Sequence, residues 1–273
     1  MSNICYPRTR FANTISNCCK QTLTGCVHRA AYDYEPEIVQ NSVGCLASLC
    51  LNIRNREQFI KVGGCKLLAD SFQTHKKDFA KYPQLPYNFC TLVKVISVSQ
   101  KAQALFVESD THEIMIKMME GDQITDYVME ESCSALANII ANVENVASVA
   151  IKSKGLLRVI GLINRKKTVA PSKVIAKLVK VIWNMTDDPT CHDACFSAKL
   201  FLVVKELLDL FHDDNEINSN VFGVLRNLSH IQDLPKRVIN DRAVALSSVI
   251  PPVVDALEHS HITGVQVKAI GFL

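Results

Sequence analysis

Three short stretches, Ala135–Asn138 (ALAN), Val181–Asn184 (VIWN) and Val224–Asn227 (VLRN), repeat the pattern Leu/Ile-x-Asn. Their asparagines follow one another after 46 and then 43 residues. Each stretch belongs to a segment whose apolar residues recur at helical spacing, and strand-like alternation is nearly absent from the chain. A fixed period of this length indicates stacked helical units, each of which buries its apolar face only against its neighbours.

A second signature follows each anchor stretch and marks the start of another amphipathic helix. It reads Ala150–Leu157 after the first anchor and Phe196–Phe201 after the next. An early copy, Phe59–Leu68, contains the pair Gly63 and Gly64, which lets one helix end sharply before the next begins. Because the period lies within the roughly 40 to 47 residues of an armadillo or HEAT unit, we expect an all-α, armadillo/HEAT-like right-handed solenoid of about five or more three-helix repeats.

The repeat pattern sets the expected domain organisation. Residues 1–33 form an irregular N-terminal segment, and residues 34–273 are expected to form the repeat domain. At its end, Val267–Leu273 resembles the start of another anchor helix that stops before the polar residue. A solenoid that ends on an uncapped apolar face is poorly soluble. We therefore expect the domain to be truncated within its last repeat and the natural core to continue beyond Leu273.

Composition excludes several classes of partner. The chain of 273 residues has 30 Lys+Arg against 27 Asp+Glu, and a net charge of +3 without a basic block is too weak to attract nucleic acid. Its longest uncharged run, Ile38–Ile53, contains polar residues and is too short to cross a bilayer. The N-terminus lacks an apolar signal core, so we expect the 11 cysteines to be free thiols in the cytosol or nucleus.

Catalytic and metal-binding motifs are not visible. The best metal candidate is Cys191–Cys195 (CHDAC), but no second ligand pair follows at zinc-finger spacing. The nucleophile-elbow, metalloprotease and P-loop patterns do not occur. We expect no enzyme activity, no cofactor and no bound metal.

The strongest candidate site surrounds Trp183, the single tryptophan of the chain. An indole face and the carboxylate of Asp187, one helical turn later, can hold an ammonium group. The amide of Asn184 can pair with the backbone of an extended peptide, as Asn138 and Asn227 can in the neighbouring repeats. Asn227 would lie roughly 10 Å further along the groove at normal helix packing distance. Alternatively, Trp183 packs in the core, Asn184 braces the repeat and Asp187 only begins a loop.

Two blocks of sequence resemble the Zyg-eleven/Zer-one family, the substrate receptors of cullin-2 RING ubiquitin ligases. They are Val181–Cys191 (VIWNMTDDPTC) and Gly223–Asn227 (GVLRN) followed by Ile231–Leu234 (IQDL). Family members carry Trp-Asn-Leu-Thr-Asp in the first block and Gly-x-Leu-x-Asn in the second, and the resemblance is clear over residues 129–273. Where they have glutamate three residues after the second asparagine, this chain has His230, which removes a formal negative charge.

The resemblance implies both a ligand and a partner. In that family the armadillo groove recognises proteins with an exposed N-terminal glycine, and the corresponding peptide-binding residues here are Trp183, Asn184, Asp187, Asn227 and His230. The leucine-rich repeats and cullin-recruiting box of the family are missing from this chain. It would therefore reach a cullin-2/elongin complex only through segments that the chain does not contain.

A general scaffold is the alternative function. An armadillo domain of importin-α or β-catenin type holds extended internal peptides along several asparagine anchors, whether or not their N-terminus is free. Importin-α-like proteins repeat Trp-x-x-x-Asn on successive units, and the single tryptophan of this chain does not supply such a ladder. The degron receptor therefore remains the first interpretation.

Overall fold

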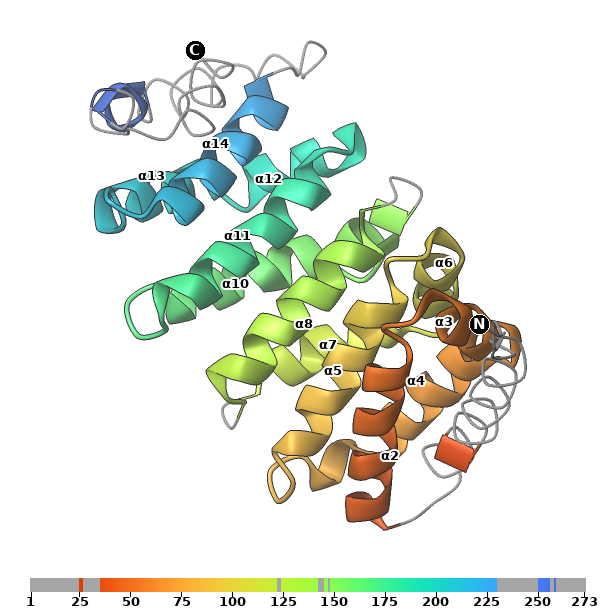
Figure 1. Cartoon of the computed structure of the whole chain (residues 1–273). Helices are drawn as coiled ribbons and strands as arrows, with labels where there is room; N and C mark the ends of the chain where they lie inside the picture. Colours follow the sequence, from red (N-terminus) through yellow and green to blue (C-terminus); the bar gives the residue numbers. More distant parts are fainter. Residues whose placement is uncertain are drawn as a thin grey trace, which may run out of the picture.

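A computed structural model describes residues 25–26, 35–121, 124–141, 145–146, 148–229, 250–255 and 258. Helices make up its regular structure, and no strand occurs in these ranges (Figure 1). The expected all-α armadillo solenoid is confirmed. The expectations for His230, for Val267–Leu273 and for residues 1–33 other than 25–26 lie outside the described residues. Among the described helices, none has both the length and the apolar character needed to span a bilayer.

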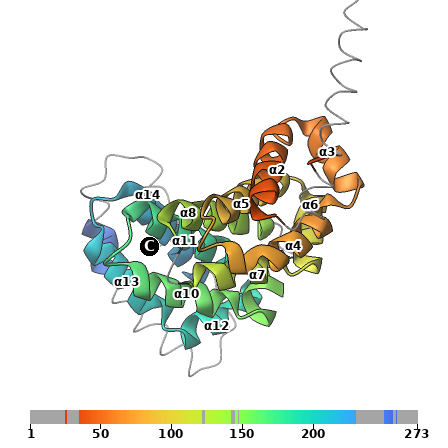
Figure 2. The ribbon, with the colours of Figure 1, turned by 90° about the horizontal axis from the view of Figure 1, so that it is seen from below.

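The helices form two main layers that run side by side along the solenoid, and the chain passes from one layer to the other in each repeat (Figures 1 and 2). One layer is a row of long helices of 13 to 15 residues, each packed against the next: α2 (Pro36–Leu49), α5 (Gln84–Ile96), α8 (Asp126–Ile139), α11 (Ser172–Thr186) and α14 (Asn215–Ser229). The second layer contains α4 (Gly64–His75), α7 (Thr111–Met119), α10 (Gly155–Lys166) and α13 (Leu200–Leu210). We call the first layer the long-helix row.

Short helices connect each long helix to the second layer. They are α3 (Ile53–Lys61), α6 (Gln100–Glu108), the π-helix η2 (Ser148–Lys152), η3 (Pro189–Cys191) and α12 (His192–Ser197), while η1 (Lys76–Asp78) follows α4. A short helix, a second-layer helix and a long helix make one repeat. The structure thus has the three-helix units that the sequence period predicts.

A left-handed residue precedes every second-layer helix. Gly63 has φ 78°, and Asp110, Lys154 and Lys199 each have φ 53°. These positions are 47, 44 and 45 residues apart, so the sharp turn predicted at the glycine pair recurs once in each repeat. A left-handed conformation costs a residue with a side chain roughly 1–2 kcal/mol. The repeat therefore keeps its geometry at three positions where the residue type opposes it.

The core is one continuous cluster that runs between the layers from Val39 to Val253. Its largest fully buried side chains include Phe72 and Phe89, whose rings stack with centroids 4.7 Å apart. Apolar residues at helical spacing place one face of each helix in this cluster. In α11, for example, Leu178, Val181 and Ile182 are buried. Neighbouring repeats thus share a core, and none needs to fold alone.

The anchor asparagines join successive members of the long-helix row. The Nδ2 atom of Asn138 donates to the carbonyl of Lys94 at 3.1 Å, and that of Asn184 donates to the carbonyl of Ala137 at 3.0 Å. Asn227 makes the next such bond, to the carbonyl of Trp183, at 3.2 Å. Each acceptor lies in the last turn of the preceding long helix, where helix carbonyls run out of intrahelical donors. We call these three bonds the asparagine ladder.

Substitution of Asn184 tests the ladder. Asn184→Ala removes the donor to the carbonyl of Ala137, and we expect the free energy of unfolding to fall by about 1 kcal/mol. Asn184→Asp keeps the size of the side chain but cannot donate, so its loss should be at least as large. Urea denaturation followed by circular dichroism measures both, and unchanged midpoints in the two variants would contradict a bracing role.

Candidate functional site

Trp183 lies in the last turn of α11, between core residues and the surface of the long-helix row. Ile182 and Met185 beside it are buried, whereas Trp183 itself is partly exposed. A Cβ atom added to Gly223 of α14 would lie 2.5 Å from Cε2 and 2.6 Å from Cδ2 of the indole. The ring therefore lies face-on against the backbone of α14 at a glycine, the one residue type that leaves room for it.

Lys180 covers the other face of the indole. Its Nζ atom lies 3.5 Å from the ring centroid. If Nζ of Lys180 lay on the Gly223 face, it would be closer to the added Cβ atom than the ring atoms are. The three atoms nearest to that Cβ atom all belong to the indole, so Nζ lies on the opposite face. Trp183 is thus enclosed between Gly223 and Lys180. The chain itself therefore already places a cation on the ring face that a ligand ammonium would use.

Asn184 and Asn227 supply acceptors close to this ring. Their Nδ2 atoms are used inside the chain, and that of Asn227 also lies 3.3 Å from Oγ1 of Thr186. Asn184 therefore braces the repeat, as the alternative interpretation expected. Within the described part of the chain, the Oδ1 atoms of both residues accept no hydrogen bond and remain outside the core. These amide oxygens can accept from an extended peptide.

Asp187 adds negative charge at the end of α11. It is the C-cap residue of this helix and is exposed. The C-terminal end of a helix carries a partial negative charge, which favours a nearby cation. Trp183, Asn184, Asp187 and Asn227 therefore lie together where α11 ends beside α14. Asn138 lies one repeat earlier in the same row, and its side chain bonds to α5, the long helix that precedes it.

Sequence reasoning missed two residues of this site. Lys180 precedes Trp183 by three positions, so the helical spacing already places the two side chains on one face. Gly223 begins the quoted GVLRN block, but its role depends on the distance between α11 and α14, which spacing alone does not give.

The stretch Cys191–Cys195 serves the core. Cys191 and Cys195 are buried, and burial raises the pKa of the Cys191 thiol to about 11. Nε2 of His192 lies 2.9 Å from the carbonyl of Thr186, so this nitrogen donates to the end of α11. Across the described ranges, no three or more His, Cys, Asp or Glu side chains gather as metal ligands would. Protonated, buried thiols are poor nucleophiles and poor ligands.

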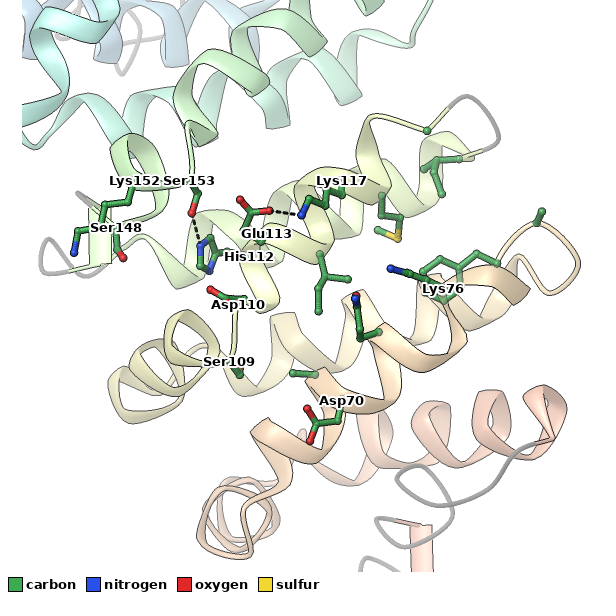
Figure 3. Close-up of a pocket in the computed structure, with 18 residues that line it drawn as sticks. Asp70, Lys76, Ser109, Asp110, His112, Glu113, Lys117, Ser148, Lys152 and Ser153 are labelled. Carbon is green, nitrogen blue, oxygen red and sulfur yellow. Dashed lines mark hydrogen bonds and ion pairs between the residues drawn. The ribbon is translucent and has the colours of Figure 1, made fainter.

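A cavity of about 1030 Å³ lies in the second layer, between α4 and α7 and away from the long-helix row (Figure 3). Its charged lining residues are Lys76, Lys117, Lys152, Asp70, Asp110 and Glu113. Glu113 pairs with Lys117 at 3.0 Å and with Arg158 at 3.5 Å. Hydrogen bonding by Lys117 lowers the pKa of the Glu113 carboxyl. The lining charges thus offset one another and do not select a ligand of either sign.

His112 links two repeats at the edge of this cavity. It is 2% exposed, and its Nε2 atom lies 2.9 Å from Oγ of Ser153 (Figure 3). Burial lowers the pKa of His112 from its ordinary value of 6.5. The folded chain therefore holds this side chain neutral at a pH where the unfolded chain begins to protonate it.

The packing of Trp183 on Gly223 can be tested by adding a methyl group. Gly223→Ala should push the indole off α14 and lower the free energy of unfolding by about 1–3 kcal/mol. Gly161→Ala, in the middle of α10, is the matched control because a Cβ atom there meets nothing within 4 Å. It should leave stability unchanged or raise it by about 0.5–1 kcal/mol. Equal effects in urea denaturation would disprove the close contact at Gly223.

His112 should make stability depend on pH. Because the pKa is lower in the folded chain, the unfolded chain binds more protons as the pH falls below about 6.5, and stability falls with it. We expect His112→Gln to reduce the loss in the free energy of unfolding between about pH 7.5 and pH 5.5. Parallel pH profiles of the wild type and the variant, measured by denaturant titration, would contradict a neutral buried His112.

Comparison with known proteins gives one family and one fold. The family described as "Protein zer-1 homolog-like, C-terminal domain" matches residues 79–265. That range contains Trp183, Asn184, Asp187, Asn227 and Asn138. No curated protein sequence matches the chain.

Solved structures share the architecture. A computationally designed armadillo repeat protein for modular peptide recognition is 16% identical, with a TM-score of 0.75 over 92% of this chain and 98% of its own. An engineered protein is 20% identical, with a TM-score of 0.76 over 92% and 96%. A chain from a structure of the cadherin and beta-catenin interaction is 14% identical, with a TM-score of 0.69 over 94% and 52%. At these identities the likeness establishes the armadillo fold alone.

Proposed function

Because the chain belongs to the family of the zer-1 homolog-like C-terminal domain, we propose that it is the substrate-recognition domain of a cullin-2 ubiquitin ligase receptor. Its ligand is the exposed N-terminal glycine of a protein substrate. The observation that carries the proposal is the cation on Trp183 in the last turn of α11, a helix that ends at the exposed residue Asp187. A peptide amino terminus is an ammonium group and has the same chemistry as this cation.

Each part of the site contributes to binding an amino terminus. The indole of Trp183 attracts the ammonium by its ring quadrupole, and Asp187 with the C-terminal end of α11 adds negative charge. The Oδ1 atoms of Asn184 and Asn227 accept from the amides of the first residues. Acetylation of the peptide removes the charge and two donors, so it should abolish the main attraction. The selection of glycine over other first residues rests on the family resemblance.

Assembly into a ligase requires other polypeptide segments. In this proposal the chain selects the substrate, and the ubiquitin transfer belongs to other subunits, so the domain itself is not an enzyme. Cullin-2 and elongin bind through parts of the receptor outside the armadillo domain. The site of action is the cytosol or nucleus.

The asparagine ladder favours a second candidate function, a general peptide scaffold. Anchor asparagines recur at Asn138, Asn184 and Asn227, so acceptors line the row over three repeats. Such a row can hold the backbone of an internal peptide without reading its sequence. A scaffold of this kind would bind acetylated and free peptides equally.

Peptide titration distinguishes the two functions. Fluorescence anisotropy should show binding of a glycine-starting peptide, weaker binding of a serine-starting control and no binding of the N-acetylated form. Trp183→Ala and Asp187→Asn should each weaken binding about tenfold or more, because each removes an interaction with the ammonium.

Asp209→Asn is the control for loss of one carboxylate. Asp209 pairs with Lys205 at 2.7 Å on α13, in the second layer. Its removal should leave peptide affinity within about twofold of the wild type, because screening weakens interactions between distant surface charges. Equal affinity for the free and acetylated peptides would reject the degron receptor and favour the scaffold.

A further inference from the structure

Lys180 occupies the ring face of Trp183 that a ligand ammonium needs. We propose that Lys180 is a built-in competitor of the peptide site, and that substrates with an acidic residue just after their N-terminal glycine displace it most readily. This inference rests on the proposed function, because it assumes that a peptide amino terminus uses Trp183. It adds a residue that sets the affinity of the site and a charge preference in the ligand.

Both faces of the indole are in contact with the chain. Gly223 closes one face, since an added Cβ atom would lie 2.5 Å from Cε2, and Nζ of Lys180 lies 3.5 Å from the centroid on the other. A second ammonium cannot bind to the ring face that Lys180 covers, because two cations in contact with the same ring face repel each other. A ligand ammonium therefore stacks on Trp183 only after Lys180 leaves.

The position of Lys180 makes it an effective competitor. Lys180 and Trp183 are three residues apart on α11, so the helix holds the two side chains together. A tethered group of this kind acts at an effective concentration on the order of millimolar. A free peptide at lower concentration must overcome this occupancy. Removal of the Lys180 charge should thus tighten peptide binding by about twofold to thirtyfold, the range of a cation–π interaction.

Two other lysines of α11 place their ammonium groups on carboxylates of neighbouring helices. Lys173 pairs with Glu130 of α8 at 2.6 Å, and Lys177 pairs with Glu216 of α14 at 3.1 Å. With Lys180 they follow one face of α11, and the first two reach carboxylates of the adjacent long helices. Lys180 reaches the indole of its own helix.

A carboxylate in the ligand can give the displaced ammonium a new partner. The amino terminus would take the place of Lys180 on the ring, and the next one or two residues would lie within reach of the displaced side chain. An acidic residue there forms an ion pair with Lys180, whereas a basic residue is repelled by it. The charge preference therefore belongs to Lys180 and should disappear with it.

The first experiment tests the contact without any peptide. In proton–carbon correlation spectra of the full chain, the ε-CH2 protons of Lys180 should be shifted upfield by the indole ring current, relative to those of Lys177. Lys180→Met assigns the signal by its disappearance. An unshifted Lys180 signal would overturn the competitor role, whatever the peptide titrations give.

The second experiment measures affinity for peptides that begin Gly-Glu or Gly-Lys. The wild type should prefer Gly-Glu, and Lys180→Met should bind both more tightly and lose the preference. Lys177→Met is the matched control, because it removes a charge from the same helix at a position whose ammonium pairs with Glu216 of α14. It should keep the preference of the wild type.

Three other outcomes would count against the inference. Weaker binding by Lys180→Met would show that Lys180 assists the ligand and would overturn the competitor role. Equal changes in Lys180→Met and Lys177→Met would assign the effect to general charge and overturn it as well. If neither the wild type nor Lys180→Met binds any glycine-starting peptide, the proposed function fails and the competitor role fails with it. In that case, an upfield shift of the Lys180 ε-CH2 signal would show only that Lys180 contacts the indole, and not that it competes with a ligand.

Discussion

The hydrogen bond from an anchor asparagine to the carbonyl of the preceding long helix is the interaction on which the arrangement of the row depends. It fixes where one long helix meets the next, because a side-chain amide has a short reach and each of the three acceptor carbonyls lies in the last turn of its helix. The core alone would permit neighbouring helices to slide, since hydrophobic packing has little directionality. With the ladder in place, the end of α11 is held beside α14, and Trp183 is brought against Gly223.

The same atoms cannot serve the fold and the ligand at once. The Nδ2 atoms of Asn184 and Asn227 are committed to the ladder, so a peptide is left with their Oδ1 atoms, the indole of Trp183 and the carboxylate of Asp187. Such a set offers acceptors and a π-face and therefore suits a cationic, donor-rich group. A peptide amino terminus has that chemistry, and Lys180 imitates it within the chain. The long-helix row thus combines a rigid backbone arrangement with a site whose occupant can be exchanged.

Much of the fold could be predicted from sequence because the repeat is written in local patterns. The spacing of Asn138, Asn184 and Asn227 gave the period, and the pair Gly63 and Gly64 gave the sharp turn that recurs at Lys154 and other equivalent positions. The bonds of the ladder were not predictable with the same certainty. An asparagine on a helix surface can brace a neighbour or bind a ligand, and only the interhelical distance decides between them.

The site was predicted in part for a similar physical reason. Helical spacing placed Trp183 and Asp187 on one face, the repeat period added Asn227 one repeat later, and the family resemblance implied the same residues. The contact of Lys180 with the ring needed a choice among side-chain rotamers, and the role of Gly223 needed the separation of α11 and α14. The cavity between α4 and α7 could not be predicted from the sequence, because its lining residues come from segments far apart in the sequence.

One measurement tests the central claim, that a free amino terminus binds at the end of α11. Trp183 is the only tryptophan of the chain, so its indole N–H gives the single tryptophan side-chain signal in a proton–nitrogen correlation spectrum. The account predicts that this signal moves as a glycine-starting peptide saturates the chain and stays in place with the acetylated peptide. A glycine-starting peptide that binds while the indole signal does not move would place the ligand elsewhere and contradict the account.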